Sequence, residues 1–304
     1  MYKEVAVDPA CIADGACFFA LREQFGFEKG RYLVADRQHW LKDAMVAVKA
    51  AQSSNELKPV MAQTIKIWLN KARGKVELKD RQILLPLNRV IDPEVLVWND
   101  WWLGQQSIRK FDVSIAPASN PPLAYDFTQL SSVQDWQISP SYSVDRTVAD
   151  IVATLEPLLR ISQEVWLVDN YFNLGSNQVL VELIRAAASR GCTQLKVVTA
   201  CDCASPKAVW TREYASLVSD TFKCEWVKVP DNYFHDRYLI TDTGAVKAGH
   251  GFAEAVRKGT AADKVSLNYC SFDEAQTVQQ QIRTLLAESK ASIILDADTA
   301  VIDE

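Results

Sequence analysis

The sequence lacks any apolar run that approaches the roughly 18 residues needed to cross a bilayer. Its first residues, from Met1 to Val5, also lack the apolar core of a signal peptide. Hydrophobic residues make up 48% of the chain and charged residues 23%, which is ordinary for a globular protein. We therefore expect a cytoplasmic protein without a transmembrane segment.

A large basic excess is missing too. The formal net charge of −5 argues against non-specific coating of DNA, although it leaves room for a local basic groove. The seven cysteines are odd in number and irregularly spaced, which makes a poor disulfide framework. The pair Cys201 and Cys203 has no second pair nearby to complete a zinc site. We expect free thiols, no metal and no other cofactor.

The sequence has no internal repeat, but proline and serine concentrate between about residues 117 and 145 and indicate a break in the chain. A length of 304 residues is enough for two domains. We predict an N-terminal domain over residues 1–130, a linker over residues 131–144, and a second domain over residues 145–304.

The N-terminal part is predicted to be mainly helical. Apolar residues recur at helical spacing over 38–52, 56–72 and 92–103, and a short strand is expected at 111–115. The tryptophans between Trp98 and Trp102 indicate either core packing or an interface for a protein partner. No catalytic motif occurs in this part.

In the C-terminal part, patterns typical of buried strands alternate with patterns typical of amphipathic helices. This alternation predicts an α/β fold with a mixed sheet flanked by helices. A hairpin is expected at 237–241 and 245–248, around Asp242, Thr243 and Gly244. The other expected strands are 164–169, 195–200, 223–229 and 264–269, and the expected helices are 145–160, 177–189, 206–218 and 273–288.

The chain has three histidines, and two of them, His235 and His250, flank this hairpin in the pattern H-x-R-x4-D-x6-G-x-G. Side chains alternate along a strand, so His235 and Arg237 should project from the same face. A guanidinium offers paired donors to phosphate oxygens, and an imidazole can attack phosphorus or transfer a proton. The pattern therefore predicts a phosphate-binding site.

Further candidates surround this pair. Asp242 could orient the imidazole or cap the turn. Gly249 and Gly251 lack side chains, so a phosphate could approach their backbone. Asp169 follows a predicted strand, at a usual ligand position in α/β sheets. The predicted catalytic residues are His235, Arg237 and Asp242, and the predicted substrate-binding residues are Asp169, Tyr171, Gly249, His250, Gly251 and Glu254.

The spacing resembles the H-x-K-x4-D-x6-G motif of the phospholipase D superfamily over about 15 consecutive residues. The alternating pattern extends the resemblance over about residues 140–304. This chain departs from the family in having Arg237 in place of the lysine and in having one copy of the motif. Two copies form one active site in the family, so the resemblance implies a homodimer through the C-terminal domain.

The residues His235-Asp236-Arg237 and Gly249-His250-Gly251-Phe252 are most similar to the phospholipase-D-like domain of proteins that carry microtubule-interacting-and-trafficking domains. That branch implies a dimerising module that binds acidic lipid headgroups. Single-motif members of the superfamily in bacterial defence and restriction systems imply a nuclease instead.

Three hypotheses follow. The first is a metal-independent phosphodiesterase, a nuclease in antiphage defence. In that case His235 attacks phosphorus, His235 of the partner subunit protonates the leaving oxygen, and Arg237 neutralises charge. The alternative is a catalytically degenerate module for assembly and for binding phosphate, lipid or nucleic acid. The third is a structural adaptor that uses the tryptophan cluster.

Overall fold

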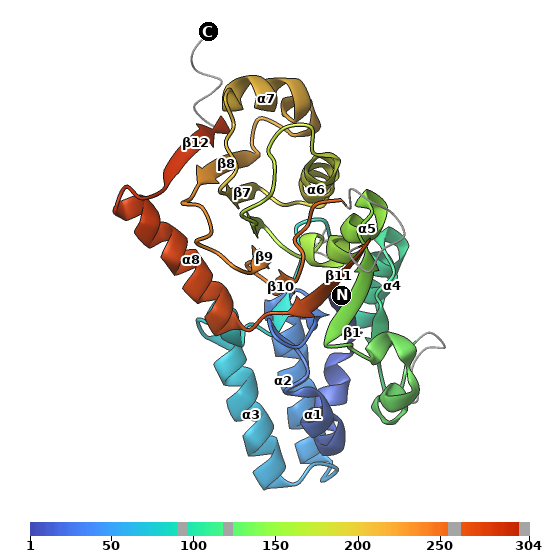
Figure 1. Ribbon diagram of the computed structural model, residues 1–304. Helices are drawn as coiled ribbons and strands as arrows, with labels where there is room; N and C mark the ends of the chain where they lie inside the picture. Colours follow the sequence, from blue (N-terminus) through green and yellow to red (C-terminus); the bar gives the residue numbers. More distant parts are fainter. Residues whose placement is uncertain (90–96, 118–123, 255–262, 298–304) are drawn as a thin grey trace. The chain divides into compact units, whose positions relative to one another are not determined.

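The computed structural model describes residues 1–89, 97–117, 124–254 and 263–297 (Figure 1). The chain forms two compact units. One is Tyr2–Ile138, and the other is Ser139–Glu304 together with Met1. Each unit is built from helices and a β-sheet, so the chain is α/β. No helix in the described parts of the chain is both long and apolar enough to span a membrane.

The first unit is mainly helical, as predicted, but it also contains a four-stranded parallel sheet of order β3-β2-β1-β4, of which the sequence predicted only the strand at 111–115. Strands β1 and β2 are short and buried on both faces, and such runs lack the alternation that would distinguish them from buried helix. The elements of this unit are β1 (Lys3–Val7), η1 (Pro9–Ala13), α1 (Gly15–Leu21), β2 (Arg31–Val34), α2 (Arg37–Ser53), α3 (Pro59–Arg73), η2 (Leu78–Asp80), β3 (Ile83–Leu84), α4 (Trp98–Ile108), β4 (Val113–Ile115), η3 (Phe127–Ser132) and η4 (Gln134–Trp136).

Helices α2 and α3 occupy the two ranges where apolar periodicity predicted helices. Helix α2 begins where the side chain of Asp36 accepts a hydrogen bond from the amide of His39. The indole of Trp40 donates to the carbonyl of Val7 at 2.6 Å and so ties the helix to β1. The third predicted helix is α4. Part of the predicted range, 92–96, lies outside the described residues.

The tryptophan cluster of α4 is core. Trp101 and Trp102 are both buried, and Trp98 stacks on Trp102 with ring centroids 6.0 Å apart. The indole of Trp102 donates to the hydroxyl of Ser114 on β4 at 2.9 Å. These contacts favour core packing over the interface for a protein partner.

The stretch 131–144, expected to be a linker, is structured on both sides of the boundary between the units. Its first part completes η3 and η4, and the ring of Trp136 lies beneath the guanidinium of Arg31 at 4.0 Å. Its last part enters β5, an edge strand of the second sheet. Within this stretch Ser131 and Ser132 end η3, and Pro140 directly precedes Ser141, the first residue of β5.

The second unit contains an eight-stranded mixed sheet of order β12-β8-β7-β6-β9-β10-β11-β5. Strands β6, β7 and β8 are parallel, and every other neighbouring pair is antiparallel. Its elements are β5 (Ser141–Asp145), α5 (Val148–Leu159), β6 (Glu164–Val168), α6 (Gln178–Ser189), β7 (Gln194–Thr199), α7 (Pro206–Glu213), η5 (Ala215–Leu217), β8 (Lys223–Lys228), β9 (Arg237–Thr241), β10 (Ala245–Ala248), β11 (Lys264–Tyr269), α8 (Phe272–Ala287) and β12 (Ser292–Asp296).

Helices cover both faces of this sheet, as the alternating pattern predicted (Figure 1). On one face α8 places the guanidinium of Arg283 over the ring of Trp166, 5.4 Å away. Helices α5 and α6 lie on the other side of the strands in Figure 1. Pro157 lies inside α5 without ending it. The sequence patterns did not predict β5 and β12, the two edge strands.

A buried ion cluster joins three parts of the first unit. The carboxylate of Glu4 on β1 accepts two hydrogen bonds from Arg89, at 3.2 and 3.1 Å, and two from Arg109, at 2.9 and 2.7 Å. The side chains of Glu4 and Arg89 are 1% and 0% exposed. A buried cation that loses its carboxylate is still desolvated but no longer paired. The stability of the first unit should therefore be sensitive to substitutions in this cluster.

We expect Glu4→Gln to lower the free energy of unfolding by about 3 kcal/mol, because two guanidinium groups would lose their counter-charge in a desolvated place. The matched control is Lys3→Gln on the same strand. Lys3 pairs with Asp135, whose side chain is 63% exposed, and at 3.7 Å with Asp112, and ion pairs in contact with water contribute about 1 kcal/mol or less. Urea unfolding of the two variants measures the difference, and equal losses would contradict the role of the buried cluster.

Candidate functional site

Three chain segments come together at one edge of the second sheet. Residues 169–171 follow β6, residues 235–237 lead into β9, and residues 249–251 follow β10. Strand β9 lies between the other two, with Tyr238 paired to Val168 and Arg237 paired to Ala248. This is the edge where the parallel strands have their carboxyl ends, the usual ligand position in such sheets. We call these three segments the site edge.

Arg237 connects all three segments. Its Nη1 donates to the carbonyl oxygens of His235, at 3.0 Å, and of Gly249, at 3.2 Å. Its guanidinium carbon lies 5.1 Å from the centre of the Tyr171 ring, a cation–π distance. Its Nε is 3.9 Å from the carboxylate of Asp169, which is an ion pair too long for a hydrogen bond. The guanidinium is therefore fixed in place by protein contacts.

Asp169 is a buried carboxylate beneath this arginine. One oxygen accepts from the amide of Tyr171 and the other from the amide of Phe252, both at 3.0 Å. Burial raises the pKa of the Asp169 carboxyl, while the two amide hydrogen bonds and the charge of Arg237 oppose the rise. Asp169 thus joins the segment after β6 to the loop after β10, as a structural anion instead of an exposed ligand group.

The two glycines of the motif differ in role. Gly251 has φ of +83°, and a Cβ atom there would lie 2.5 Å from a carboxylate oxygen of Asp169. The absence of a side chain at Gly251 therefore lets the protein's own carboxylate approach the backbone. Gly249 has no atom within 4 Å of a Cβ position, so the approach of a ligand to its backbone stays a prediction.

The remaining motif side chains are exposed. His235 and His250 both lie at the surface, and neither ring has a hydrogen-bond partner within the ranges that the structure describes. The backbone around each is tied to Arg237 through the carbonyls of His235 and Gly249. Glu254 is also exposed and is the last described residue before 255–262.

Asp242 lies at the opposite end of β9 from His235, so the expectation that it orients the imidazole requires correction. Its carboxylate accepts hydrogen bonds from the amides of Gln163, at 2.8 Å, and Glu164, at 3.3 Å. These bonds connect the turn after β9 to the start of β6. Of the two roles considered for Asp242, the structure therefore favours the local structural one.

Sequence reasoning missed two residues of this region. Arg146, directly after β5, donates through Nε and Nη2 to the carbonyl of Ala253, at 3.1 and 3.0 Å, and holds the loop that carries Gly251. Asn170 donates to the carbonyl of Phe234 at 2.6 Å and fixes the segment before His235. Asn170 adjoins a predicted site residue, whereas no signal near the motif could have identified Arg146.

A separate charge cluster occupies the opposite face of the sheet. The ammonium of Lys247 lies 2.8 Å from Asp236 and 3.1 Å from Glu274, and the hydroxyl of Tyr238 donates to Glu274 at 2.9 Å. Burial alone would raise the pKa of Glu274, but the hydrogen bonds from Lys247 and Tyr238 outweigh it and hold the pKa below its ordinary value. Asp236 is thus paired with Lys247 and does not neutralise Arg237.

No protein-family model matches the chain, and no curated protein matches it. Among solved structures, one similar chain is TrmBL2, an archaeal chromatin protein whose structure shows a novel mode of DNA binding. The two share 14% sequence identity over 53% of this chain and 57% of that chain, with a TM-score of 0.32. This chain therefore spans little more than half of that protein's length, and a likeness of this size says nothing about what this chain binds.

Replacing Gly251 by alanine should destabilise the second unit by roughly 2 kcal/mol, because alanine would adopt a left-handed backbone conformation against Asp169. Gly249→Ala is the matched control, two residues away with open space around it, and should stay within about 0.5 kcal/mol of the parent protein. Thermal and urea unfolding report both changes. A smaller loss for Gly251→Ala than for Gly249→Ala would contradict the close approach of Asp169.

The raised pKa of Asp169 should appear in the pH dependence of stability. Below the ordinary aspartate pKa, about 3.9, the carboxyl is protonated in both states. Above it the unfolded state loses its proton first, so the free energy of unfolding should fall as pH rises towards the raised folded-state pKa. Asp169→Asn does not titrate and should lack this fall, whereas the exposed control Asp220→Asn should keep it. Urea unfolding at a series of pH values measures the slopes, and parallel slopes for Asp169→Asn and the parent would refute the assignment.

Proposed function

We propose that the second unit binds a phosphodiester of single-stranded nucleic acid at the site edge. The position of Arg237 carries the proposal. Its guanidinium is held by two carbonyl oxygens and an aromatic ring, while Nη2 bonds no atom in the described ranges. The free N–H groups of Nη2 can donate to a phosphate oxygen. Because the guanidinium is already fixed, the side chain loses little conformational entropy when the phosphate binds.

Aromatic surface beside the arginine favours nucleic acid over a lipid headgroup. The side chain of Tyr171 is 59% exposed even though its hydroxyl donates to Asn232 at 2.8 Å. Tyr233, in the segment that leads to His235, is 43% exposed. Bases stack on exposed aromatic rings without regard to sequence, and a phosphate contact beside such rings is typical of single-strand binding.

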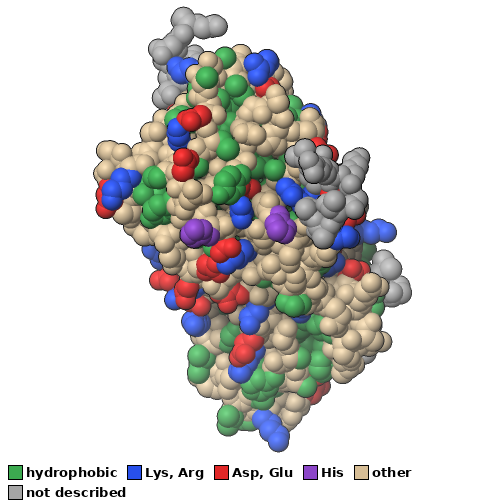
Figure 2. All heavy atoms as spheres, in the orientation of Figure 1, with side chains coloured by type: hydrophobic (Ala, Val, Ile, Leu, Met, Phe, Trp, Pro, Cys, Tyr) green, Lys and Arg blue, Asp and Glu red, His purple; other side chains and the backbone are tan. Residues whose placement is uncertain are grey.

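Charge limits the kind of nucleic acid that this site would bind. Basic and acidic side chains are interspersed over the face shown in Figure 2, without a continuous basic surface. The net charge of −5 likewise provides no long-range attraction for a duplex. The proposed ligand is therefore a short single-stranded stretch that is held by a few local contacts. The resemblance to the phospholipase D superfamily supports the same phosphodiester chemistry.

Metal-independent hydrolysis is a second candidate, favoured by the exposed imidazole of His235 two residues from Arg237. In that reaction an imidazole nitrogen would form a bond to phosphorus while one P–O bond breaks. The departing oxygen would take a proton from a second imidazole, either His235 of the partner subunit or His250, and water would then cleave the N–P bond. A nuclease of this kind would suit antiphage defence. Binding comes first because no carboxylate in the described ranges orients the His235 ring.

Arg237→Ala should weaken binding of a fluorescein-labelled oligothymidylate at least tenfold, because one charge-assisted hydrogen bond contributes about 1.5–3 kcal/mol. The control is Arg185→Ala, an exposed arginine on α6 that pairs with Glu182 and lies outside the site edge. Fluorescence anisotropy at two salt concentrations gives the affinity and its salt dependence, and thermal unfolding checks that each variant is folded.

Three outcomes decide between the functions. Binding that is lost in Arg237→Ala and kept in Arg185→Ala supports the proposal. Retained binding in both variants, or attachment only to vesicles that contain phosphatidylserine, refutes it. Cleavage of the oligonucleotide in the presence of EDTA that disappears in His235→Ala would establish the second candidate instead.

A further inference from the structure

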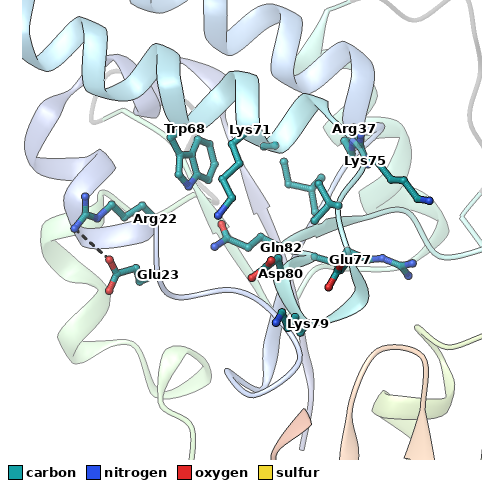
Figure 3. A pocket seen from close by; sticks show the side chains of 14 residues that line it. Arg22, Glu23, Arg37, Trp68, Lys71, Lys75, Glu77, Lys79, Asp80 and Gln82 are labelled. Atoms are coloured by element: carbon teal, nitrogen blue, oxygen red, sulfur yellow. Dashed lines mark ion pairs between the residues drawn. The ribbon is translucent and has the colours of Figure 1, made fainter. Parts of the chain in front are cut away.

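The first unit contains a cleft of about 630 Å³ that is separate from the site edge. It lies beside the edge strand β3, between the end of α1, the C-terminal half of α3 and the segment 75–83 (Figure 3). This volume lies within the usual range for small-molecule sites. The proposed function makes no use of this cleft.

The lining of the cleft is strongly basic. Six of the side chains that line it are basic and three are acidic. This excess contrasts with the net charge of −5 of the whole chain. A concave surface with one dominant sign of charge concentrates ligands of the opposite sign, so the cleft selects anions.

Three of these cations have no partner in the part of the chain that the structure describes. Lys71, Lys75 and Lys79 line the cleft, and none of their ammonium groups makes a hydrogen bond or ion pair within the described ranges. Two arginines of the same lining are already engaged: Arg22 pairs with Glu23 at 3.1 Å, and Arg37 donates to the carbonyls that end α3. A lysine in the last turn of a helix favours the helix dipole, which could explain Lys71 alone. Lys75 and Lys79 lie beyond the helix, so that explanation does not cover them.

An aromatic ring and an unpaired amide oxygen occupy the same cleft. Trp68 is half-buried, and its ring is fixed by an edge contact with Phe18, with centroids 5.7 Å apart. The side-chain oxygen of Gln82 is buried and has no hydrogen-bond partner in the described ranges. Figure 3 shows Lys71 between Trp68 and Gln82. A flat heterocycle would stack on the indole, and a rotation of the Gln82 side chain would expose its buried oxygen to an amino hydrogen of that ring.

We infer that this cleft binds a nucleotide, with its base against Trp68 and Gln82 and its phosphates against Lys71, Lys75 and Lys79. Glu77 and Asp80 share the lining and limit the net positive charge. Inorganic polyphosphate offers the same anionic chemistry without a ring, so the experiment must separate the two sources.

Isothermal titration of the full-length protein with ATP, adenosine and pyrophosphate tests the inference. ATP should bind at least ten times more tightly than either adenosine or pyrophosphate, because each of those ligands lacks one half of the contacts. The double variant Lys71→Glu/Lys75→Glu should lose at least tenfold in ATP affinity. Lys49→Glu, an exposed lysine on α2 outside the cleft, is the matched control and should bind ATP like the parent.

Trp68→Phe keeps a ring for packing against Phe18 but offers less stacking surface, so it should weaken ATP and leave pyrophosphate unchanged. Equal affinities for ATP and pyrophosphate would overturn the base contact and with it the assignment to a nucleotide. Absence of ATP binding, or equal binding by the double variant and the parent, would overturn the site itself. Both lysines of the double variant are exposed, and thermal unfolding verifies that this variant is folded.

Discussion

The second unit depends on one buried carboxylate. Asp169 accepts amide hydrogen bonds from its own segment and from the loop after β10, and it lies next to the guanidinium that holds the segment before β9. Removing it would leave the amides of Tyr171 and Phe252 without their acceptor and would take away the negative charge beside Arg237, whose own hydrogen bonds go to backbone carbonyls. The segment after β6 is distant in the chain from the β9–β10 hairpin although the strands are adjacent in the sheet, so this carboxylate makes a connection that local sequence does not encode.

Sequence patterns predicted most helices of both units but missed β1, β2 and β3 of the first unit, for a physical reason. Amphipathic helices such as α6, and a hairpin bounded by Asp242 and Gly244, carry local signals of period and turn chemistry. The strands of the first unit are too short and too completely buried to alternate. The edge strands β5 and β12 were also missed, because both expose much of their length.

In the candidate site, too, the sequence predicted what lies within one local segment and missed the contacts between distant segments. The motif identified His235, Arg237 and Gly251 as neighbours, since all three lie within one hairpin and its flanks. It could not reveal that the anion facing Gly251 is the protein's own Asp169, or that Arg146 reaches the same loop from β5. Those contacts are set by how strands pair in space, and a single sequence contains no information on pairing between distant segments.

The position of Asp242 explains why four residues separate it from Arg237 in the motif. Arg237 anchors one end of β9 to the loops of the site edge, and Asp242 anchors the other end to the start of β6. The four residues between them span β9, so their number fixes the distance between the two anchored ends of the strand. Deleting one of them would detach an anchor and turn every later side chain of the strand to the opposite face of the sheet. The number of residues between Arg237 and Asp242 is thus set by the structure of the strand and not by catalysis. A relative that lacks the histidine would keep the same spacing.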